Sequence, residues 1–136
     1  MTTYNFEVSR ELPADPATIY RAWLSSEGHG AMTGAVASVD PVVGGAFSAW
    51  DGYIGGRTLD LEPDRRIVQS WRTSEFTAEH LDSQIEVLLD ATPSGTLVTI
   101  KHSGVPVEQT GYEHGGWDDS YFEPMSEYFA QAGDPA

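Results

Sequence analysis

The chemistry open to this chain depends first on a few polar side chains that the hydrophobic pattern directs inward. His102 ends a strand-like alternation with Val98 and Ile100, which predicts that its imidazole shares their inward face. Such a histidine is either a hydrogen-bonded core residue or a polar anchor for a ligand in an apolar cavity. Arg57 could act similarly, since an inward guanidinium needs a carboxylate or a ligand anion. A slip of one residue in strand phase would turn it outward.

Other arrangements of reactive residues are weakly represented. The histidines at positions 29, 80, 102 and 114 have neither helical nor zinc-finger spacing, and the chain has no cysteine. There is no Gly-x-Ser-x-Gly motif, and no helix start follows the glycine pairs 44–45 and 55–56 to cradle a phosphate. We therefore expect no metal and no cofactor, and we favour binding over catalysis. Acid–base catalysis stays open through groups at the predicted groove, namely Tyr53, Arg57, His102 and Tyr121.

Short strand-like segments, separated by turn signals, must position these side chains. A first strand is predicted over 3–10, and the six that follow the first helix are predicted over 34–39, 46–50, 53–62, 67–74, 81–91 and 96–103. Their short connections predict antiparallel pairing, and a sheet of about seven strands has to twist and curl. The two glycine pairs are predicted to supply bends or bulges in it.

Two helices are predicted beside the strands. Asp15 suits the N-cap and Pro16 the first turn of a short amphipathic helix. Residues 25–33 are interrupted by glycine and predict a loop with one helical turn. A very aromatic helix is predicted over 115–129, and it alone is bulky enough to fill the groove of the curled sheet. Pro124 predicts a kink within it, and we hypothesise that this kink lets the helix end move and admit a ligand.

This order predicts one α+β domain over residues 1–136, with a curved antiparallel sheet wrapped around the C-terminal helix. Most inward side chains are needed for the core, because each large apolar side chain contributes roughly 1.5–3 kcal/mol when fully buried. The alternative is that some of them line a ligand cavity. The candidate lining residues are Trp23, Met32, Phe47, Tyr53, Arg57, Trp71, Ile85, His102, Tyr121, Met125 and Phe129.

The chain resembles the START-like (SRPBCC) superfamily and, within it, the C-terminal domain of the activator of heat-shock protein 90 ATPase and its homologues. The segments that carry the resemblance are 44–47, 51–52, 56–72, 95–96, 102–106 and 116–122. The resemblance implies a helix-grip fold and three alternative roles. These are a non-enzymatic binding protein for a small apolar or amphipathic ligand, which is our leading hypothesis, a chaperone cofactor, and a polyketide cyclase-like enzyme.

Composition restricts the partners. The chain has 7 basic and 21 acidic residues, a net charge of −14 that disfavours nucleic-acid binding. The acidic residues are scattered, which favours a solvated coat over a face that steers towards a basic partner. No apolar run reaches the ~18 residues of a membrane span, and we expect a cytoplasmic monomer or homodimer. A cavity well above ~300 Å³ would favour ligand binding, whereas a closed interior would favour protein interaction.

Overall fold

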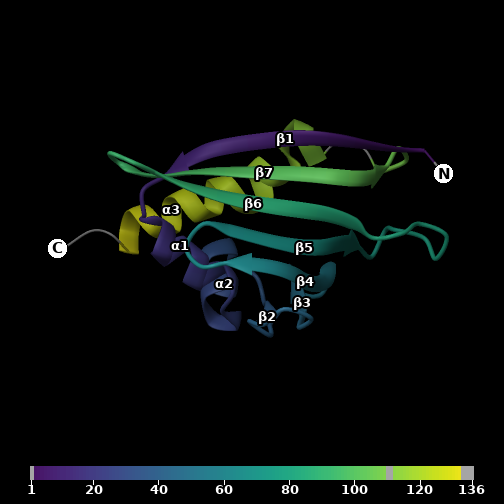
Figure 1. Cartoon of the computed structure of the whole chain (residues 1–136), viewed down its shortest axis with the longest axis horizontal. Coiled ribbons are helices and arrows are strands. Elements are labelled where there is room, and N and C mark those ends of the chain that lie inside the picture. The colour runs from purple at the N-terminus through teal and green to yellow at the C-terminus, as the bar shows by residue number, and fades with distance from the viewer. Residues whose placement is uncertain (1, 110–111, 133–136) are drawn as a thin grey trace.

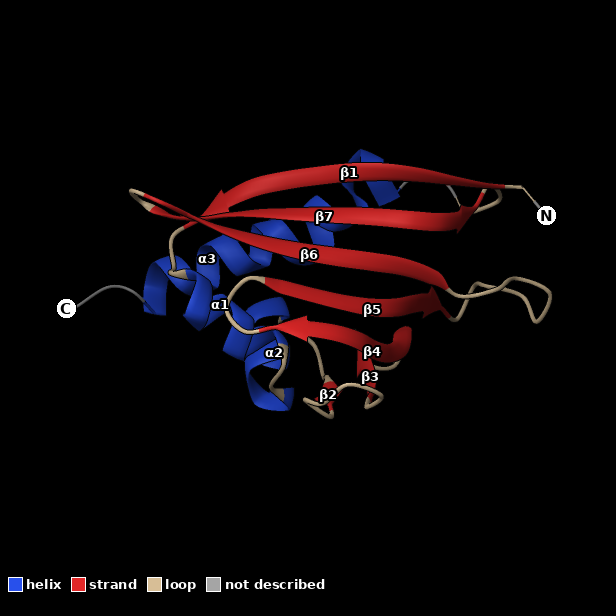
Figure 2. Ribbon diagram, in the orientation of Figure 1, coloured by secondary structure: helices blue, strands red, loops and turns tan. Residues whose placement is uncertain are grey.

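A computed structural model describes residues 2–109 and 112–132 and contains one seven-stranded antiparallel sheet. The strands lie in the order β1-β7-β6-β5-β4-β3-β2, and the helices gather on one face of the sheet (Figures 1 and 2). The predicted helix-grip α+β fold is confirmed. The strands are β1 (Thr3–Leu12), β2 (Ser38–Val39), β3 (Ala46–Ala49), β4 (Ile54–Glu62), β5 (Arg66–Thr73), β6 (Ser83–Thr92) and β7 (Gly95–Pro106).

Alternating side chains make the sheet amphipathic. In β6 and β7 the inward residues Ile85, Val87, Val98 and Ile100 are almost completely buried, as a half-buried strand requires. The sheet bends at register shifts, one in β1 opposite β7 and one in β4 between Thr58 and Asp60. The strand predicted over 34–39 is reduced to the two residues of β2, which end the sheet at one edge.

Two short helices follow β1. The helix α1 (Pro16–Trp23) begins as predicted, since the Asp15 carboxylate accepts a hydrogen bond from the Thr18 amide at 2.8 Å. The loop predicted over 25–33 is wrong, because these residues form a second helix, α2 (Ser26–Thr33). Its glycines serve close packing, since a Cβ at Gly28 would lie 2.8 Å from the Ala22 backbone in α1.

The C-terminal helix is wound unevenly. Two π-helical turns, η1 (Tyr112–Gly116) and η2 (Asp118–Phe122), lead directly into α3 (Glu123–Ala132). Pro124 therefore lies in the first turn of α3, at the change of winding and not inside a uniform helix. It lacks the N–H that an α-helix directs to the carbonyl of Ser120, and the Trp50 indole N–H donates to that carbonyl at 3.1 Å. The residues of this segment that pack onto the sheet are Trp117, Tyr121, Phe122, Met125 and Phe129.

Gly56 in β4 permits a close approach between strands. A Cβ at this position would lie 1.9 Å from the Ser70 carbonyl oxygen in β5 and 2.8 Å from the ring of Phe47. The bulge of β4 lies further along the strand, after Thr58. The glycine pair 55–56 thus marks a tight contact between backbones, and the bend predicted there lies about two residues further on.

Candidate functional site

A buried hydrogen-bond chain joins α1, α2, η2 and the sheet. Tyr121 donates its hydroxyl proton to His29 Nε2 at 2.7 Å, because Nδ1 of His29 must carry a proton to donate to the Trp23 carbonyl at 2.9 Å. Trp23 in turn donates its indole N–H to the Gln69 side chain at 3.1 Å. Burial lowers the pKa of His29 and raises that of Tyr121, so both groups are neutral. Tyr121 was predicted as a ligand contact, but its hydroxyl is hydrogen-bonded to His29 inside the protein.

A second buried chain surrounds His102. The Ser83 hydroxyl donates to the Trp71 carbonyl at 2.6 Å, so His102 Nε2 must donate to Ser83 at 2.8 Å. His102 Nδ1 then accepts the indole N–H of Trp117 at 3.2 Å. Burial lowers the pKa of His102 to about 3. The prediction that His102 points inward is therefore right, and both of its ring nitrogens are occupied by protein groups.

The other ten candidate residues separate into three groups. Arg57 lies on the outer face, exposed, with its guanidinium donating to the Gly44 carbonyl at 3.0 Å, so its predicted inward direction is wrong. Ile54 and Thr58 take the inward positions of β4, and strand alternation then turns residue 57 outward. The candidates that are buried in the core without lining a cavity are Trp23, Met32, Phe47, Ile85, Met125 and Phe129.

Tyr53, Trp71 and Tyr121 do meet, at a small pocket between β4, β5 and the π-helical turns. Its volume is about 160 Å³, and its lining residues are Tyr53, Ile54, Trp71, Tyr112, Gly116, Trp117, Ser120 and Tyr121. We call this the aromatic pocket. Trp117 and Tyr112 were not among the candidates predicted from the sequence. At helical spacing Trp117 shares a face with Tyr121 and Met125, whereas Tyr112 precedes the predicted helix.

The mouth of the aromatic pocket carries a carboxylate. Tyr53 is 38% exposed and donates its hydroxyl to Glu75 at 2.6 Å. Partial burial, together with this hydrogen bond, raises the pKa of Tyr53 to about 12. Burial also raises the pKa of Tyr112, and the negative charge of Glu75 adds to that effect. The pocket therefore combines ring faces within and negative charge at its opening.

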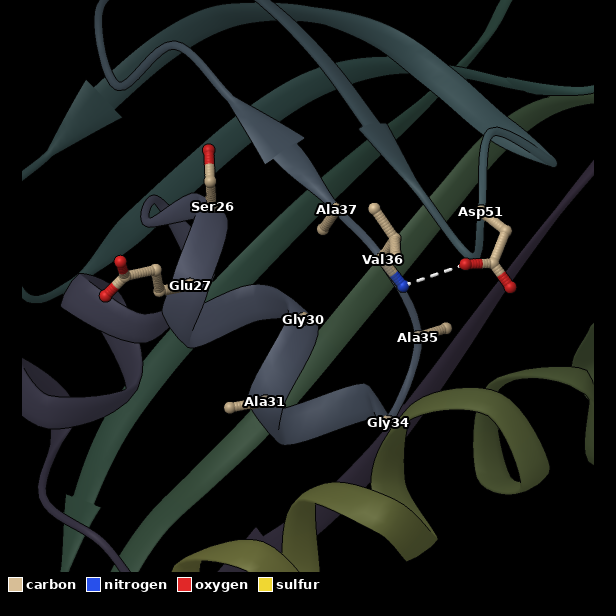
Figure 3. Close-up of a pocket in the computed structure, with 9 residues that line it drawn as sticks. All are labelled: Ser26, Glu27, Gly30, Ala31, Gly34, Ala35, Val36, Ala37 and Asp51. Carbon is tan, nitrogen blue, oxygen red and sulfur yellow. Dashed lines mark hydrogen bonds between the residues drawn. The ribbon is translucent and has the colours of Figure 1, made fainter.

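A larger, open groove has Asp51 of the β3–β4 turn among its lining residues. It has a volume of about 630 Å³, is open to solvent, and lies between α2 and residues 34–37 (Figure 3). Most of its lining residues are small, and Glu27, Val36 and Asp51 are the larger ones. Asp51 holds the Val36 amide at 3.0 Å, and residues 50 and 51 both adopt positive φ angles of 51° and 58°. Tertiary contacts hold this strained turn in place. One of them is the hydrogen bond from the Trp50 indole to the carbonyl of Ser120, which lines the aromatic pocket.

Two features are absent from the part of the chain that the structure describes. No group of three or more His, Asp or Glu side chains is placed to hold a metal ion within 2–109 and 112–132. Over the same residues, no helix has the length and apolar character needed to cross a membrane.

The sequence matches the family described as "Activator of Hsp90 ATPase homolog 1-like protein" over residues 13–130. A human relative, "Activator of 90 kDa heat shock protein ATPase homolog 1", is 28% identical over 114 residues, which is 84% of this chain and 33% of the relative. The chain thus spans about a third of the length of the curated relatives it matches.

Solved structures share the whole architecture. The crystal structure of an HSP90 activator from Plasmodium falciparum superposes with a TM-score of 0.81 at 21% identity, covering 93% of this chain and 96% of the other. A Chromobacterium violaceum protein superposes with a TM-score of 0.72 at 26% identity, covering 91% and 96%. Sequence and fold agree that this chain, a START-like domain, belongs to the activator of Hsp90 ATPase homolog 1-like family.

Proposed function

We propose that this protein is a protein-binding module that docks on a chaperone of the Hsp90 class. The observation that carries the proposal is the filled interior. The aromatic pocket holds about 160 Å³, whereas ligand pockets usually enclose at least ~300 Å³. The polar groups of His29, His102 and Tyr121 are hydrogen-bonded to the protein itself. A closed helix-grip domain leaves its surface as the larger binding region, and relatives named as activators of the Hsp90 ATPase support this partner.

The edge of the sheet at β2 offers the surface for such docking. Val36 precedes β2, and Val42 and Val43 follow it, with exposures of 72%, 52% and 60%. Asp40 and Asp51 lie in the same region, and Asp51 is hydrogen-bonded to the backbone of Val36. Exposed aliphatic side chains beside carboxylates suit a partner surface that is apolar and basic. We call residues 36–43 and Asp51 the β2 edge.

A pull-down against the host chaperone, followed by its ATPase assay, tests the proposal. We expect a complex at low ionic strength that weakens with added salt, because a chain of net charge −14 is attracted to basic surfaces. Val36→Asp should weaken the complex by roughly tenfold, since it removes about 1–2 kcal/mol of apolar burial and adds a buried charge.

Leu81→Asp is the matched control. Leu81 is 84% exposed, in the long loop between β5 and β6, away from β2 (Figure 1). The variant carries the same charge change and should bind like the wild type. Absence of a complex at low salt, with no change in ATPase rate, would contradict the proposed function, and equal weakening by both variants would contradict the β2 edge.

The aromatic pocket supports a second candidate function, the binding of a small ligand. At about 160 Å³ it has room for roughly five water molecules at ~30 Å³ each. The expected ligand is therefore far smaller than a lipid chain. A polyketide cyclase has to fold a long flexible substrate within its cavity, and the filled interior argues against that third role.

A further inference from the structure

Aromatic rings form most of the wall of the aromatic pocket, beside Ile54, Gly116 and Ser120. Five of its eight lining residues are aromatic. The Trp71 ring stands perpendicular to that of Tyr112, with centroids 5.1 Å apart and an interplanar angle of 83°. The Trp117 ring is inclined by 38° to Trp71 and by 48° to Tyr121. Rings at such different inclinations form the walls of a cage and not a parallel stack.

Two of these rings direct their polar atoms away from the pocket. The indole N–H of Trp117 is bound by His102, and the hydroxyl of Tyr121 is bound by His29. What these side chains offer to an occupant is therefore the π face and the ring edge. The face of an aromatic ring carries negative electrostatic potential and attracts cations.

Fixed charge at the pocket has the same sign. The Glu75 carboxylate accepts the hydroxyl of Tyr53 at the mouth and acts electrostatically on Tyr112. All seven lysine and arginine residues lie in the described part of the chain, and none of them lines the pocket. An entering cation would thus meet no basic side chain in the lining.

The type of cation follows from the cost of removing its hydration. A primary ammonium has three N–H donors, each of which needs an acceptor when it leaves water. The Trp117 indole N–H is a donor only, and the Tyr121 hydroxyl is turned to His29, so neither ring offers an acceptor to an ammonium group. A quaternary ammonium has no N–H group, presents an apolar surface of methyl groups, and binds well to aromatic cages.

We propose that the aromatic pocket binds a quaternary ammonium group of about the size of choline. This inference gives a ligand class to the small-molecule role, on which it rests, and it is independent of chaperone docking. The same group occurs in free choline-like metabolites and in the headgroup of phosphatidylcholine, and both present it in the same chemical form.

Calorimetric titration with choline and with 3,3-dimethyl-1-butanol tests the ligand class. The alcohol replaces the charged nitrogen by carbon and keeps the shape. We expect choline to bind about tenfold more tightly or better, the range of a partly desolvated cation–π site. Tyr112→Leu should weaken choline binding several-fold, and so should Glu75→Gln, which alters an exposed side chain and leaves the core intact.

Glu79→Gln is the matched control, because Glu79 is an exposed carboxylate in the same loop and, unlike Glu75, makes no hydrogen bond to any of the described residues that line the aromatic pocket. It should bind choline like the wild type. Equal affinity for the alcohol and for choline would overturn the cation inference and leave the small-molecule role in place. Binding of neither compound would overturn both.

Sedimentation with phosphatidylcholine vesicles identifies the source of the group. Pelleting of wild type but not of Tyr112→Leu would assign the lipid headgroup. Choline binding without pelleting would assign a free metabolite, and either result agrees with the proposed ligand class.

Discussion

Acidification should destabilise this protein through His102, and the structure gives the size of the effect. The imidazole is completely buried, and its pKa falls from 6.5 to about 3 on folding. Protonation would also place a second N–H against the indole N–H of Trp117, which donates to Nδ1 in the neutral form. Between about pH 6.5 and pH 3, His102 therefore binds a proton in the unfolded chain but not in the folded protein.

The sign of the dependence follows from this difference. A base whose pKa is lowered on folding contributes full stability above about pH 6.5 and loses it progressively as the pH falls towards 3. Between pH 7 and pH 5 the expected loss from His102 is about 2 kcal/mol, from the shift of its pKa. His29, whose pKa is also lowered, contributes in the same direction.

Urea unfolding of the wild type and of His102→Gln at both pH values isolates the contribution of His102. The 21 acidic residues and His29 are common to both proteins, so their titration largely cancels in the difference. Glutamine can still accept from Trp117 and donate to Ser83, although we expect a loss of about 1–3 kcal/mol at pH 7 from imperfect geometry.

The wild type should lose about 2 kcal/mol more than His102→Gln on going from pH 7 to pH 5. Equal losses in the two proteins would refute the reasoning, because His102 would then titrate alike in the folded and unfolded states. An NMR titration offers an independent check, since the His102 ring should remain neutral at pH 4.5.

Two further predictions concern the backbone. Trp50→Phe removes the indole donor to the Ser120 carbonyl, so it should lower the free energy of unfolding by about 1 kcal/mol. It should also speed hydrogen exchange at the backbone amides of residues 125–132. Adding Pro124→Ala, which restores a backbone N–H, should recover part of that protection; unchanged exchange in Trp50→Phe would sink this account. Gly56→Ala should destabilise by roughly 1–3 kcal/mol or more, because its Cβ would collide with a carbonyl of β5. Gly55→Ala, whose Cβ has 3.6 Å of clearance, should be milder in thermal unfolding, and equal effects would contradict the steric reason.

Local patterns in the sequence were sufficient for most of the fold. The strands were predictable because the side chains of a half-buried strand alternate between two environments, and β7 shows this alternation up to His102. The start of α1 was predictable because Asp15 and Pro16 satisfy requirements that lie within one turn of the helix. The same reasoning failed at α2, where Gly28 is needed for packing against Ala22 of α1, because a pattern within one helix does not show how two helices pack together.

The candidate site was less predictable than the fold. Arg57 was expected inside because the phase of β4 was uncertain from its glycine-rich sequence, and pairing with β3 and β5 decided it. Tyr112 belongs to a stretch with no strand alternation, and only the winding of η1 brings its ring to Trp71. The kink expected at Pro124 became a change from π-helical to α-helical winding, with Trp50 bound to the carbonyl of Ser120.

By itself the sequence determined an antiparallel sheet around an aromatic C-terminal helix, because hydrophobic periodicity and helix caps act over a few residues. The tertiary structure alone decided how much space remains between them. That remaining volume is the small difference between the space that the sheet encloses and the summed volumes of the side chains that fill it. It also decided that His102 and Tyr121 bind protein partners, because hydrogen bonds between residues distant in the chain depend on how the elements pack.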